Sequence, residues 1–309
     1  MANRGWTRRE TLETLAAGAL LWPLPAFGIS RTQQQMLTRS IPSTGENLPA
    51  VGLGTWQTFD VGGSAGDRGD VREVLRLFVQ HGGSLVDSSP MYARAEGVVG
   101  DLATELGVAH QLFQATKVWT RGRGEGIRQM EQSFDRMRVQ TMDLMQIHNL
   151  VDWRTHLATL REWKARGRIR YIGITHYVVD AFDELEQIIG SEDLDFVQLN
   201  FSIATRAAER RMLPYAAERG VAVIVNRPYE SGALFRQARG HELPDWAAEF
   251  DCASWGQFFL KYILSEPHVS CVIPATSDPR HLVDNMRAGY GRLPDTAMRQ
   301  RMVQHLEEL

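Results

Sequence analysis

The chain has 309 residues, 43% of them hydrophobic, which allows a large buried core and is an ordinary length for an α/β barrel. Its formal net charge is −3 and it contains no long basic run, which argues against nucleic-acid binding through a broad phosphate-contacting surface. The two cysteines, Cys252 and Cys271, lack metal-ligand spacing, so no metal site is expected and two buried thiols are favoured over a disulfide.

Residues 1–28 differ from the rest of the chain. They combine a basic start, an apolar run from Leu15 to Leu24 and a small-residue end, which is the layout of a signal peptide. The apolar run is too short to span a bilayer, so no stable membrane span is expected. The segment Thr7–Leu12 resembles a twin-arginine export signal and predicts a periplasmic protein. If the signal is not used, the protein is cytoplasmic, and cell fractionation of an Arg8→Lys, Arg9→Lys variant distinguishes the two locations.

Residues 29–309 are predicted to form one domain that opens with a hairpin. Two short extended pieces flank Ser43–Glu46, a turn-forming tetrapeptide, and this indicates an N-terminal β-hairpin. Eight short apolar runs follow, each suited to a parallel strand buried on both faces. They are Val51–Gly54, Ser84–Asp87, Leu112–Thr116, Leu144–His148, Ile169–Ile174, Phe196–Leu199, Val221–Val225 and Val269–Ile273.

Amphipathic stretches with helical spacing separate these runs. The stretch from Val71 to Gly82, for example, places its apolar residues on one face and ends at a glycine. Eight strands alternating with helices predict a (β/α)8 TIM barrel with a C-terminal helical tail. A doubly wound sheet is the alternative, but the first strand leads into the segment from Gly52 to Trp56, which lacks a complete GxGxxG motif.

Four side chains with complementary proton chemistry stand near the ends of successive predicted strands. Asp87 ends the second strand, Tyr92 lies on the loop after it, Lys117 ends the third and His148 ends the fourth. The carboxyl ends of barrel strands share one face, so all four are expected at one mouth. A tyrosine hydroxyl has a free pKa of about 10, which a nearby ammonium lowers. The set suggests proton transfer to a carbonyl oxygen, with Tyr92 as the acid.

Seven segments resemble, in order, motifs of the aldo-keto reductase family. They are GLGTW at 52–56, the six residues Asp87–Tyr92, the Thr116–Lys117 pair with Trp119, Ile147–His148, YIGIT at 171–175, VQLN at 197–200 and VIPATSDPRHLVDN at 272–285. The resemblance runs roughly from Met36 to Met286. It implies an NAD(P)H-dependent oxidoreductase that reduces an aldehyde or ketone to an alcohol. In this reaction Tyr92 is the general acid, Lys117 tunes it, Asp87 pairs with Lys117 and His148 directs the carbonyl.

The same resemblance implies the cofactor and the residues that bind it. NADPH is expected, with NADH as the alternative. The implied cofactor-binding residues are Gly54, Thr55, Trp56, Asp87, Thr175, His176, Gln198, Asn226, Arg227, Thr276, Ser277, Arg280, His281 and Asn285. Gln198 matches the family glutamine that hydrogen-bonds the nicotinamide carboxamide, and Asn285 matches a position near the adenine.

Three positions depart from the family pattern. His176 stands where asparagine is usual, and Asn226 stands where many members stack an aromatic ring on the nicotinamide. Ala275 replaces a basic residue that often meets the adenosine 2′-phosphate. The remaining candidates for that phosphate contact are Thr276, Ser277, Arg280 and His281. The charge would come from Arg280 or His281, because arginine suits bidentate phosphate binding. A solvated helix N-terminus is the alternative interpretation of both.

The substrate is expected to be a small carbonyl compound. Trp56, Met91, Trp119, His148 and Asn149 would ring the mouth of the barrel. The two tryptophans and the methionine suggest an apolar or aromatic carbonyl, although packing under loops explains them equally well. No partner protein is indicated, and a monomer or weak homo-oligomer is expected.

Other classes of function compete with this interpretation. A nicotinamide-binding sensor or regulatory subunit of the same fold has less need for Tyr92 and Lys117 together, so the complete set of four favours an enzyme. A lyase that uses Lys117 as a Schiff-base amine is disfavoured, because a nearby Asp87 favours the charged ammonium over the neutral amine. A periplasmic scaffold without turnover is the third alternative. Nicotinamide binding by the purified protein separates the sensor and the enzyme from the other two.

Overall fold

The structure is a computed structural model in which residues 35–309 are described. The predicted signal peptide, residues 1–28, lies outside the described residues and stays a prediction. The described part opens with strands β1 (Thr38–Ser40) and β2 (Asn47–Pro49), which pair antiparallel with Thr38 opposite Pro49. The predicted N-terminal hairpin is therefore confirmed.

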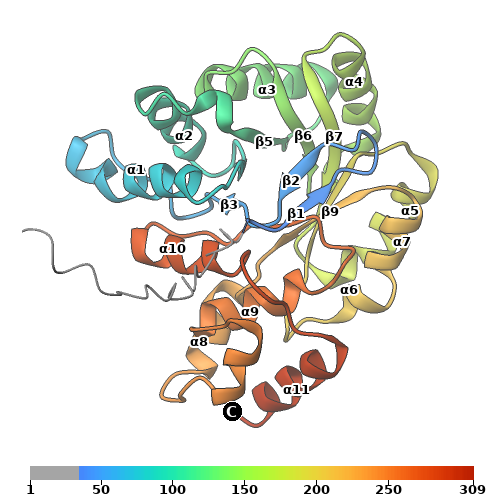
Figure 1. Ribbon diagram of the computed structural model, residues 1–309. Helices are drawn as coiled ribbons and strands as arrows, with labels where there is room; N and C mark the ends of the chain where they lie inside the picture. Colours follow the sequence, from blue (N-terminus) through green and yellow to red (C-terminus); the bar gives the residue numbers. More distant parts are fainter. Residues whose placement is uncertain (1–34) are drawn as a thin grey trace, which may run out of the picture. The chain divides into compact units, whose positions relative to one another are not determined.

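Eight parallel strands follow and form one sheet in sequential order from β3 to β10 (Figure 1). They are β3 (Leu53–Gly54), β4 (Leu85–Asp87), β5 (Phe113–Val118), β6 (Met142–His148), β7 (Ile169–Thr175), β8 (Phe196–Asn200), β9 (Ala222–Asn226) and β10 (Cys271–Val272). Isolated parallel bridges, Val51 to Val272 and Gly54 to Ala275, join the first strand region to the last. The sheet thus curls into a barrel, and the predicted (β/α)8 fold is confirmed.

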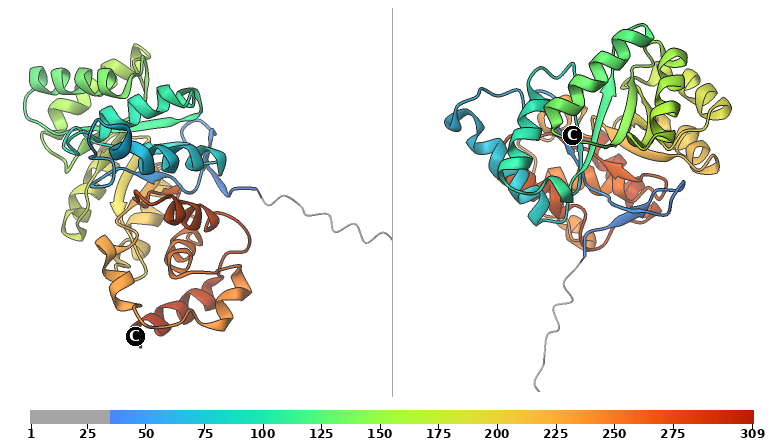
Figure 2. Two further views of the ribbon diagram at one scale, coloured as in Figure 1. Left: turned by 90° about the vertical axis from the view of Figure 1, so that its left-hand side faces the viewer. Right: turned by 90° about the horizontal axis from the view of Figure 1, so that it is seen from above.

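Helices run between the strands and surround the barrel (Figure 2). They are α1 (Ala65–Gln80), α2 (Ala95–Glu105), α3 (Arg123–Met137), α4 (Trp153–Ala165), α5 (Phe182–Ser191), α6 (Ala207–Arg210), α7 (Met212–Glu218), α8 (Ala233–Gln237), α9 (Trp255–Leu264), α10 (Pro279–Arg287) and α11 (Thr296–Glu307). Short 3-10 turns span Ala109–Gln111, Val179–Ala181, Glu230–Gly232 and Asp245–Phe250. The last helix, α11, is the predicted C-terminal helical tail. It packs on α9, where the His305 ring stacks on Trp255.

Helix α1 begins well before the predicted apolar face. Its N-cap is Ser64, whose hydroxyl accepts from the Asp67 N–H, while the Asp67 carboxylate accepts from the Ser64 N–H. This reciprocal capping box satisfies two backbone donors and starts the helix in a polar, glycine-rich stretch. The hydrophobic pattern from Val71 reports only the part of the helix that is buried, so it predicted too late a start.

The interior of the barrel is filled near the amino ends of the strands. Phe113, Tyr171 and Phe196 are buried together there, and Ile41 and Leu48 of the hairpin belong to the same cluster. The hairpin therefore closes one end of the barrel and leaves the carboxyl ends of the strands as the open mouth. Cys252 and Cys271 are both buried and unlinked, as expected. Between residues 35 and 309, no helix is both long and apolar enough to cross a membrane.

Candidate active site

A buried ion pair lies at the mouth, between β4 and β5. Lys117 Nζ is 2.5 Å from Asp87 Oδ2 and donates to the Ser88 carbonyl at 2.7 Å. The Lys117 side chain is wholly buried and Asp87 is 2% exposed. Burial alone lowers the pKa of Lys117, but the charges and hydrogen bonds of Asp87 and Tyr92 outweigh it, so its pKa is raised. The lysine is therefore an ammonium, as the sequence predicts.

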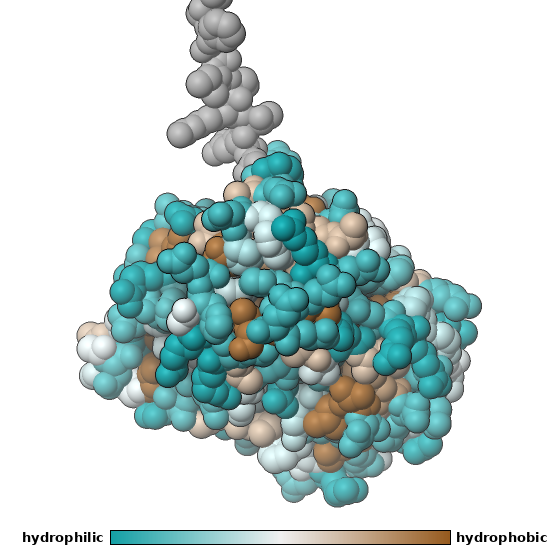
Figure 3. All heavy atoms as spheres, turned by 90° about the horizontal axis from the view of Figure 1, so that it is seen from below, coloured by the Kyte–Doolittle hydropathy of each residue, from teal (hydrophilic) through white to brown (hydrophobic). Residues whose placement is uncertain are grey.

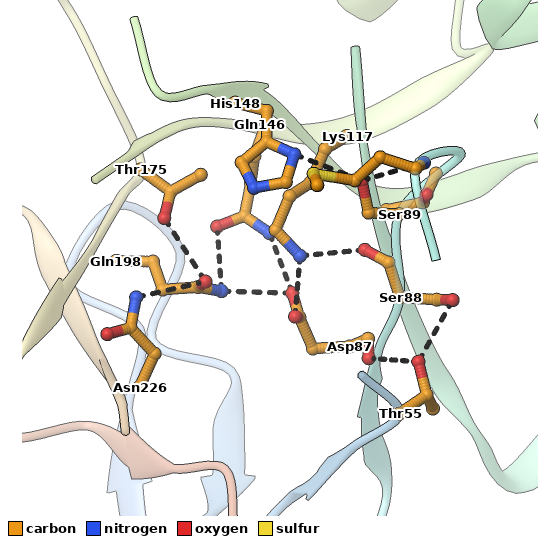
Figure 4. Close-up of polar contacts among 12 residues, drawn as sticks. Thr55, Asp87, Ser88, Ser89, Lys117, Gln146, His148, Thr175, Gln198 and Asn226 are labelled. Atoms are coloured by element: carbon orange, nitrogen blue, oxygen red, sulfur yellow. Dashed lines mark hydrogen bonds and ion pairs between the residues drawn. The ribbon is translucent and has the colours of Figure 1, made fainter. Parts of the chain in front are cut away.

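Side-chain amides support the other oxygen of the Asp87 carboxylate (Figure 4). Gln146 Nε2 and Gln198 Nε2 donate to Asp87 Oδ1 at 3.0 and 2.9 Å. Gln198 Oε1 accepts from Thr175 Oγ1 at 3.1 Å and from Asn226 Nδ2 at 3.4 Å. One hydrogen-bonded chain therefore crosses the barrel from the end of β9 to the Asp87–Lys117 pair, and it joins a predicted catalytic residue to predicted cofactor residues.

Tyr92 and His148 lie beside this ion pair. Lys117 Nζ is 5.1 Å from the centre of the Tyr92 ring, and the Tyr92 and His148 ring centres are 6.0 Å apart at nearly a right angle. Burial raises the pKa of the Tyr92 hydroxyl, and the Lys117 ammonium opposes this without reversing it. The net direction is upward, contrary to the expected lowering, because the loss of hydration outweighs one nearby positive charge.

His148 is a neutral imidazole in this setting. Burial, followed by repulsion from Lys117 and from a protonated His176, lowers the pKa of His148 to about 3. Its Nδ1 lies 3.0 Å from Ser89 Oγ. Thr55 Oγ1 donates to the Asp87 carbonyl at 3.0 Å and is hydrogen-bonded to Ser88 Oγ at the same distance. Hydroxyl groups thus hold the loop after β4 in place. If Ser89 donates to Nδ1, the ring proton resides on Nε2 and can be given to a ligand.

Two stacked aromatic rings after β7 and a guanidinium after β9 lie close together at the mouth. The Tyr177 ring stacks on His176 with ring centres 5.6 Å apart and an angle of 8° between their planes. The Arg227 guanidinium lies 5.6 Å from the centre of the Tyr177 ring. Asn226 Oδ1, Arg227 Nε and Asn149 Oδ1 are buried without a hydrogen-bond partner. Such orphaned groups at the mouth fit a polar ligand such as a nicotinamide dinucleotide, because unpaired buried polar atoms are otherwise rare.

The predicted phosphate-binding residues gather at the start of α10. The Asp278 side chain caps this helix by accepting from the Arg280 N–H at 2.8 Å, and Thr276 Oγ1 accepts from the Asp278 N–H at 3.0 Å. Arg280 is exposed and pairs with Asp278 at 2.7 Å, while Ser277 and His281 are exposed beside it. Asn285, by contrast, is buried, and its Oδ1 accepts from the Tyr229 hydroxyl at 2.6 Å.

Several large hydrophobic side chains are exposed near the mouth of the barrel. The large hydrophobic side chains that the described residues expose are Trp56, Met91, Trp119, Tyr177 and Phe235. The first four lie just after the carboxyl ends of β3, β4, β5 and β7, whereas Phe235 lies on α8. The Trp119 ring centre is 6.2 Å from that of His148. Figure 3 shows a different pattern on one outer face, which is mostly hydrophilic with small separate hydrophobic patches. The exposed apolar side chains after β3, β4, β5 and β7 therefore lie at the end of the barrel that carries the candidate site.

The site also contains residues that the sequence interpretation did not single out. Gln146, Ser88 and Ser89 contact the predicted catalytic residues directly, and Tyr177 contacts predicted cofactor residues. Gln146 carried a usable signal, since it is the one amide in the otherwise apolar segment from Leu144 to Ile147. The serines and Tyr177 carried none, because polar and aromatic residues are ordinary on loops. No three His, Cys, Asp or Glu side chains in residues 35–309 group so as to hold a metal ion.

Comparison with known proteins gives one family. The model of the aldo/keto reductase family matches residues 50–302. Methylglyoxal reductase YeaE of Escherichia coli is 27% identical over 246 residues, which cover 77% of this chain and 84% of that protein. The NADH-specific methylglyoxal reductase of the same organism is 29% identical over 229 residues, which cover 62% and 67% of the two chains.

Solved structures agree with the barrel. An aldo-keto reductase from Klebsiella pneumoniae, crystallised in complex with NADPH, superposes with a TM-score of 0.74 over 88% of this chain and 96% of that one. The two sequences are 21% identical, so this match bears on the fold alone.

Proposed function

Because this chain belongs to the aldo/keto reductase family, we propose that it reduces an aldehyde or ketone to an alcohol with NADPH or NADH. The observation that carries the proposal is the buried Asp87–Lys117 ion pair, 2.5 Å long, with the Lys117 ammonium 5.1 Å from the centre of the Tyr92 ring. A buried, charged lysine beside a tyrosine suits proton donation by the tyrosine. It does not suit Schiff-base chemistry, which needs the neutral amine. The names of the methylglyoxal reductases support the same class of reaction.

A bound reduced nicotinamide supplies the hydride. The residues proposed to hold the dinucleotide are those at the ends of β7 to β9 and at the start of α10. The orphaned Asn226 Oδ1 and Arg227 Nε are consistent with a polar group there. Arg280 and His281 are exposed at the start of α10, where Arg280 pairs with Asp278, and this exposure suits contact with a 2′-phosphate.

Tyr92 is the proposed general acid. Its raised pKa keeps the hydroxyl protonated at neutral pH, so it can donate to the carbonyl oxygen as negative charge develops there. The Lys117 ammonium stabilises the phenolate that remains, and Asp87 holds Lys117 in position. Neutral His148 donates its Nε2–H to the same carbonyl oxygen and orients it. Lys117 and His148 thus stabilise negative charge that appears only during the reaction.

The proposed substrate is an apolar or aromatic carbonyl compound. Trp56, Met91 and Trp119 expose apolar surface near the four catalytic side chains (Asp87, Tyr92, Lys117 and His148), and Asn149 adds an unpaired buried acceptor. Apolar walls with a few placed polar groups are typical of small-molecule sites.

The test is a panel of aldehydes and ketones offered with NADPH and with NADH, using the parent protein, Tyr92→Phe and Tyr215→Phe. The Tyr92→Phe variant removes only the proton donor, so we expect kcat to fall by about a hundredfold or more while cofactor affinity is kept. Tyr215→Phe makes the same chemical change outside the mouth, on α7, and should leave turnover unchanged.

Two outcomes would contradict the proposal. Full turnover in Tyr92→Phe would show that another group donates the proton. Tight cofactor binding by the parent protein without turnover on any carbonyl would favour the alternative, a nicotinamide-binding sensor or regulatory subunit.

A further inference from the structure

Trp119 is the first residue after β5, and its indole lies beside His148 at the mouth of the barrel. The ring centres of the two side chains are 6.2 Å apart, with 55° between the ring planes. Trp119 is 41% exposed, whereas His148 is 6% exposed. A large apolar side chain is therefore held at the surface next to the imidazole that is proposed to orient the carbonyl, and a substrate that reaches His148 passes close to the indole.

The side chain of Gln129, on α3, binds both backbone polar groups of Trp119. Gln129 Oε1 accepts from the Trp119 N–H at 2.6 Å, and Gln129 Nε2 donates to the Trp119 carbonyl at 3.2 Å. This is the pair of bonds that two opposed residues exchange in an antiparallel sheet. It fixes the backbone of Trp119 and so the direction of its Cα–Cβ bond, which leaves the indole only a few staggered positions.

Helix α4 fastens the residues that follow Trp119. His156 is wholly buried, and its Nε2 lies 2.8 Å from the Thr120 carbonyl, which can only accept, so Nε2 is the donor. Asp152, the N-cap residue of α4, accepts from the Gly122 N–H at 2.7 Å through Oδ2. Three of the four residues from Trp119 to Gly122 are therefore bonded to side chains of α3 or of α4 and its N-cap. A loop held at this many points keeps its shape when a ligand arrives.

We propose that Gln129 is a positioning residue for substrate choice. By fixing the backbone of Trp119 it makes the indole a rigid wall beside His148, and this wall limits the thickness of the carbonyl compound that reaches His148 and Tyr92. A flat aromatic aldehyde stacks against such a wall, whereas a saturated ring with the same number of carbons collides with it. The inference rests on the proposed function, since it requires a carbonyl substrate at this mouth.

The test compares benzaldehyde with cyclohexanecarbaldehyde, which carries the same number of carbons in a thicker ring. The constants kcat and KM are measured at saturating cofactor for the parent, Gln129→Met and Gln132→Met. Gln129→Met keeps the length of the side chain and removes both hydrogen bonds to Trp119. We expect its KM for benzaldehyde to rise about fivefold and its KM for cyclohexanecarbaldehyde not to rise, with kcat nearly unchanged. Gln132→Met makes the same change at an exposed position of α3 and should match the parent.

A double mutant shows whether Gln129 acts through the indole. Trp119→Ala should by itself remove the parent's discrimination between the two aldehydes. Adding Gln129→Met to Trp119→Ala should change neither KM further, because the wall is already gone. A residue that only braces the fold would instead lower activity on both aldehydes, with or without the indole.

Several results would overturn the inference and leave the proposed function standing. They are no change in either KM in Gln129→Met, equal weakening of both aldehydes, a further loss in the double mutant, or a parent that reduces other carbonyl compounds but neither of these two. If the parent reduces no carbonyl compound at all, the proposed function fails as well. Thermal unfolding of each variant checks the fold. If Gln129→Met does not fold, Gln129→Glu replaces it, because it keeps an acceptor for the Trp119 N–H and should shift KM in the same direction by a smaller factor.

Discussion

At the residue scale, the site depends on how burial and charge oppose each other. Lys117 is wholly buried and remains an ammonium because Asp87 lies 2.5 Å away. Asp87 in turn has hydrogen-bond donors on both oxygens, which stabilises a carboxylate removed from water. His148 lacks a carboxylate partner among these contacts and loses its charge instead. The same mouth thus holds a charged lysine and a neutral histidine, and both states suit carbonyl reduction.

The buried histidine should make stability depend on pH. The pKa of His148 is about 3 when folded, whereas an unfolded histidine has a pKa of about 6.5. Between these values only the unfolded state binds the proton, so stability falls as the pH drops below 6.5. Between pH 7 and pH 5 we expect the free energy of unfolding of the parent to fall by about 2 kcal/mol more than that of His148→Gln, measured by urea unfolding. The exposed His110 is the control, and His110→Gln should lose stability just as the parent does.

At the element scale, α10 presents its N-terminus to solvent beside the mouth. Asp278 caps the helix and also pairs with Arg280, and the Arg280 side chain is 87% exposed. These interactions lower the pKa of Asp278 and keep it ionised. A carboxylate this close to Arg280 partly neutralises the charge proposed to meet a 2′-phosphate. The preference for NADPH over NADH should therefore be modest.

Replacing Arg280 tests that contact. In Arg280→Gln we expect the dissociation constant for NADPH to rise by about fivefold, because an exposed charge-assisted contact contributes only about 1 kcal/mol. The constant for NADH, which has no 2′-phosphate, should not change. Arg287→Gln, in the last turn of the same helix, is the matched control and should affect neither cofactor. Equal weakening of both cofactors would instead assign Arg280 to the pyrophosphate or to the helix itself.

At the scale of the whole molecule, the barrel closes along one narrow seam. The strand order runs from β3 to β10, and only the bridges at Val51 and Gly54 join the two ends in the described structure. Gly52 lies between these bridges. A Cβ there would approach Leu85 O to 2.9 Å and Cys271 Sγ to 3.0 Å, closer than ordinary contacts. The seam thus requires the absence of a side chain at this position.

Adding one methyl group at the seam should destabilise the entire fold. We expect Gly52→Ala to lower the free energy of unfolding by about 1–3 kcal/mol, the usual effect of overpacking, with a lower Tm in calorimetry. Gly63→Ala is the control, because a Cβ at Gly63 would meet nothing within 4 Å. A Gly52→Ala variant as stable as the parent would contradict this, because the chain at the seam could then move to admit the methyl group without lowering the free energy of unfolding.

The sequence by itself determined the barrel and the positions of the four catalytic side chains at successive strand ends. Burial on both faces makes each strand a short apolar run. A chain that repeats such runs eight times between amphipathic helices therefore predicts parallel strands in a (β/α)8 barrel. Asp87, Lys117 and His148 were found because they interrupt those runs where the strands end, and parallel strands bring such ends to one face. The short strands at the seam, β3 and β10, were predicted too long, since apolar character reports burial and not pairing.

Only the tertiary structure decided which atoms those residues meet. Gln146 and Gln198 are distant in sequence, and their shared contact with Asp87 Oδ1 depends on the register of strands around the barrel. The unpaired oxygen of Asn226 and the raised pKa of the Tyr92 hydroxyl also follow from how the barrel mouth is packed. Periodicity along a chain records how deeply a residue is buried. Hydrogen-bond partners and lost hydration depend on neighbours that the fold brings from elsewhere in the chain.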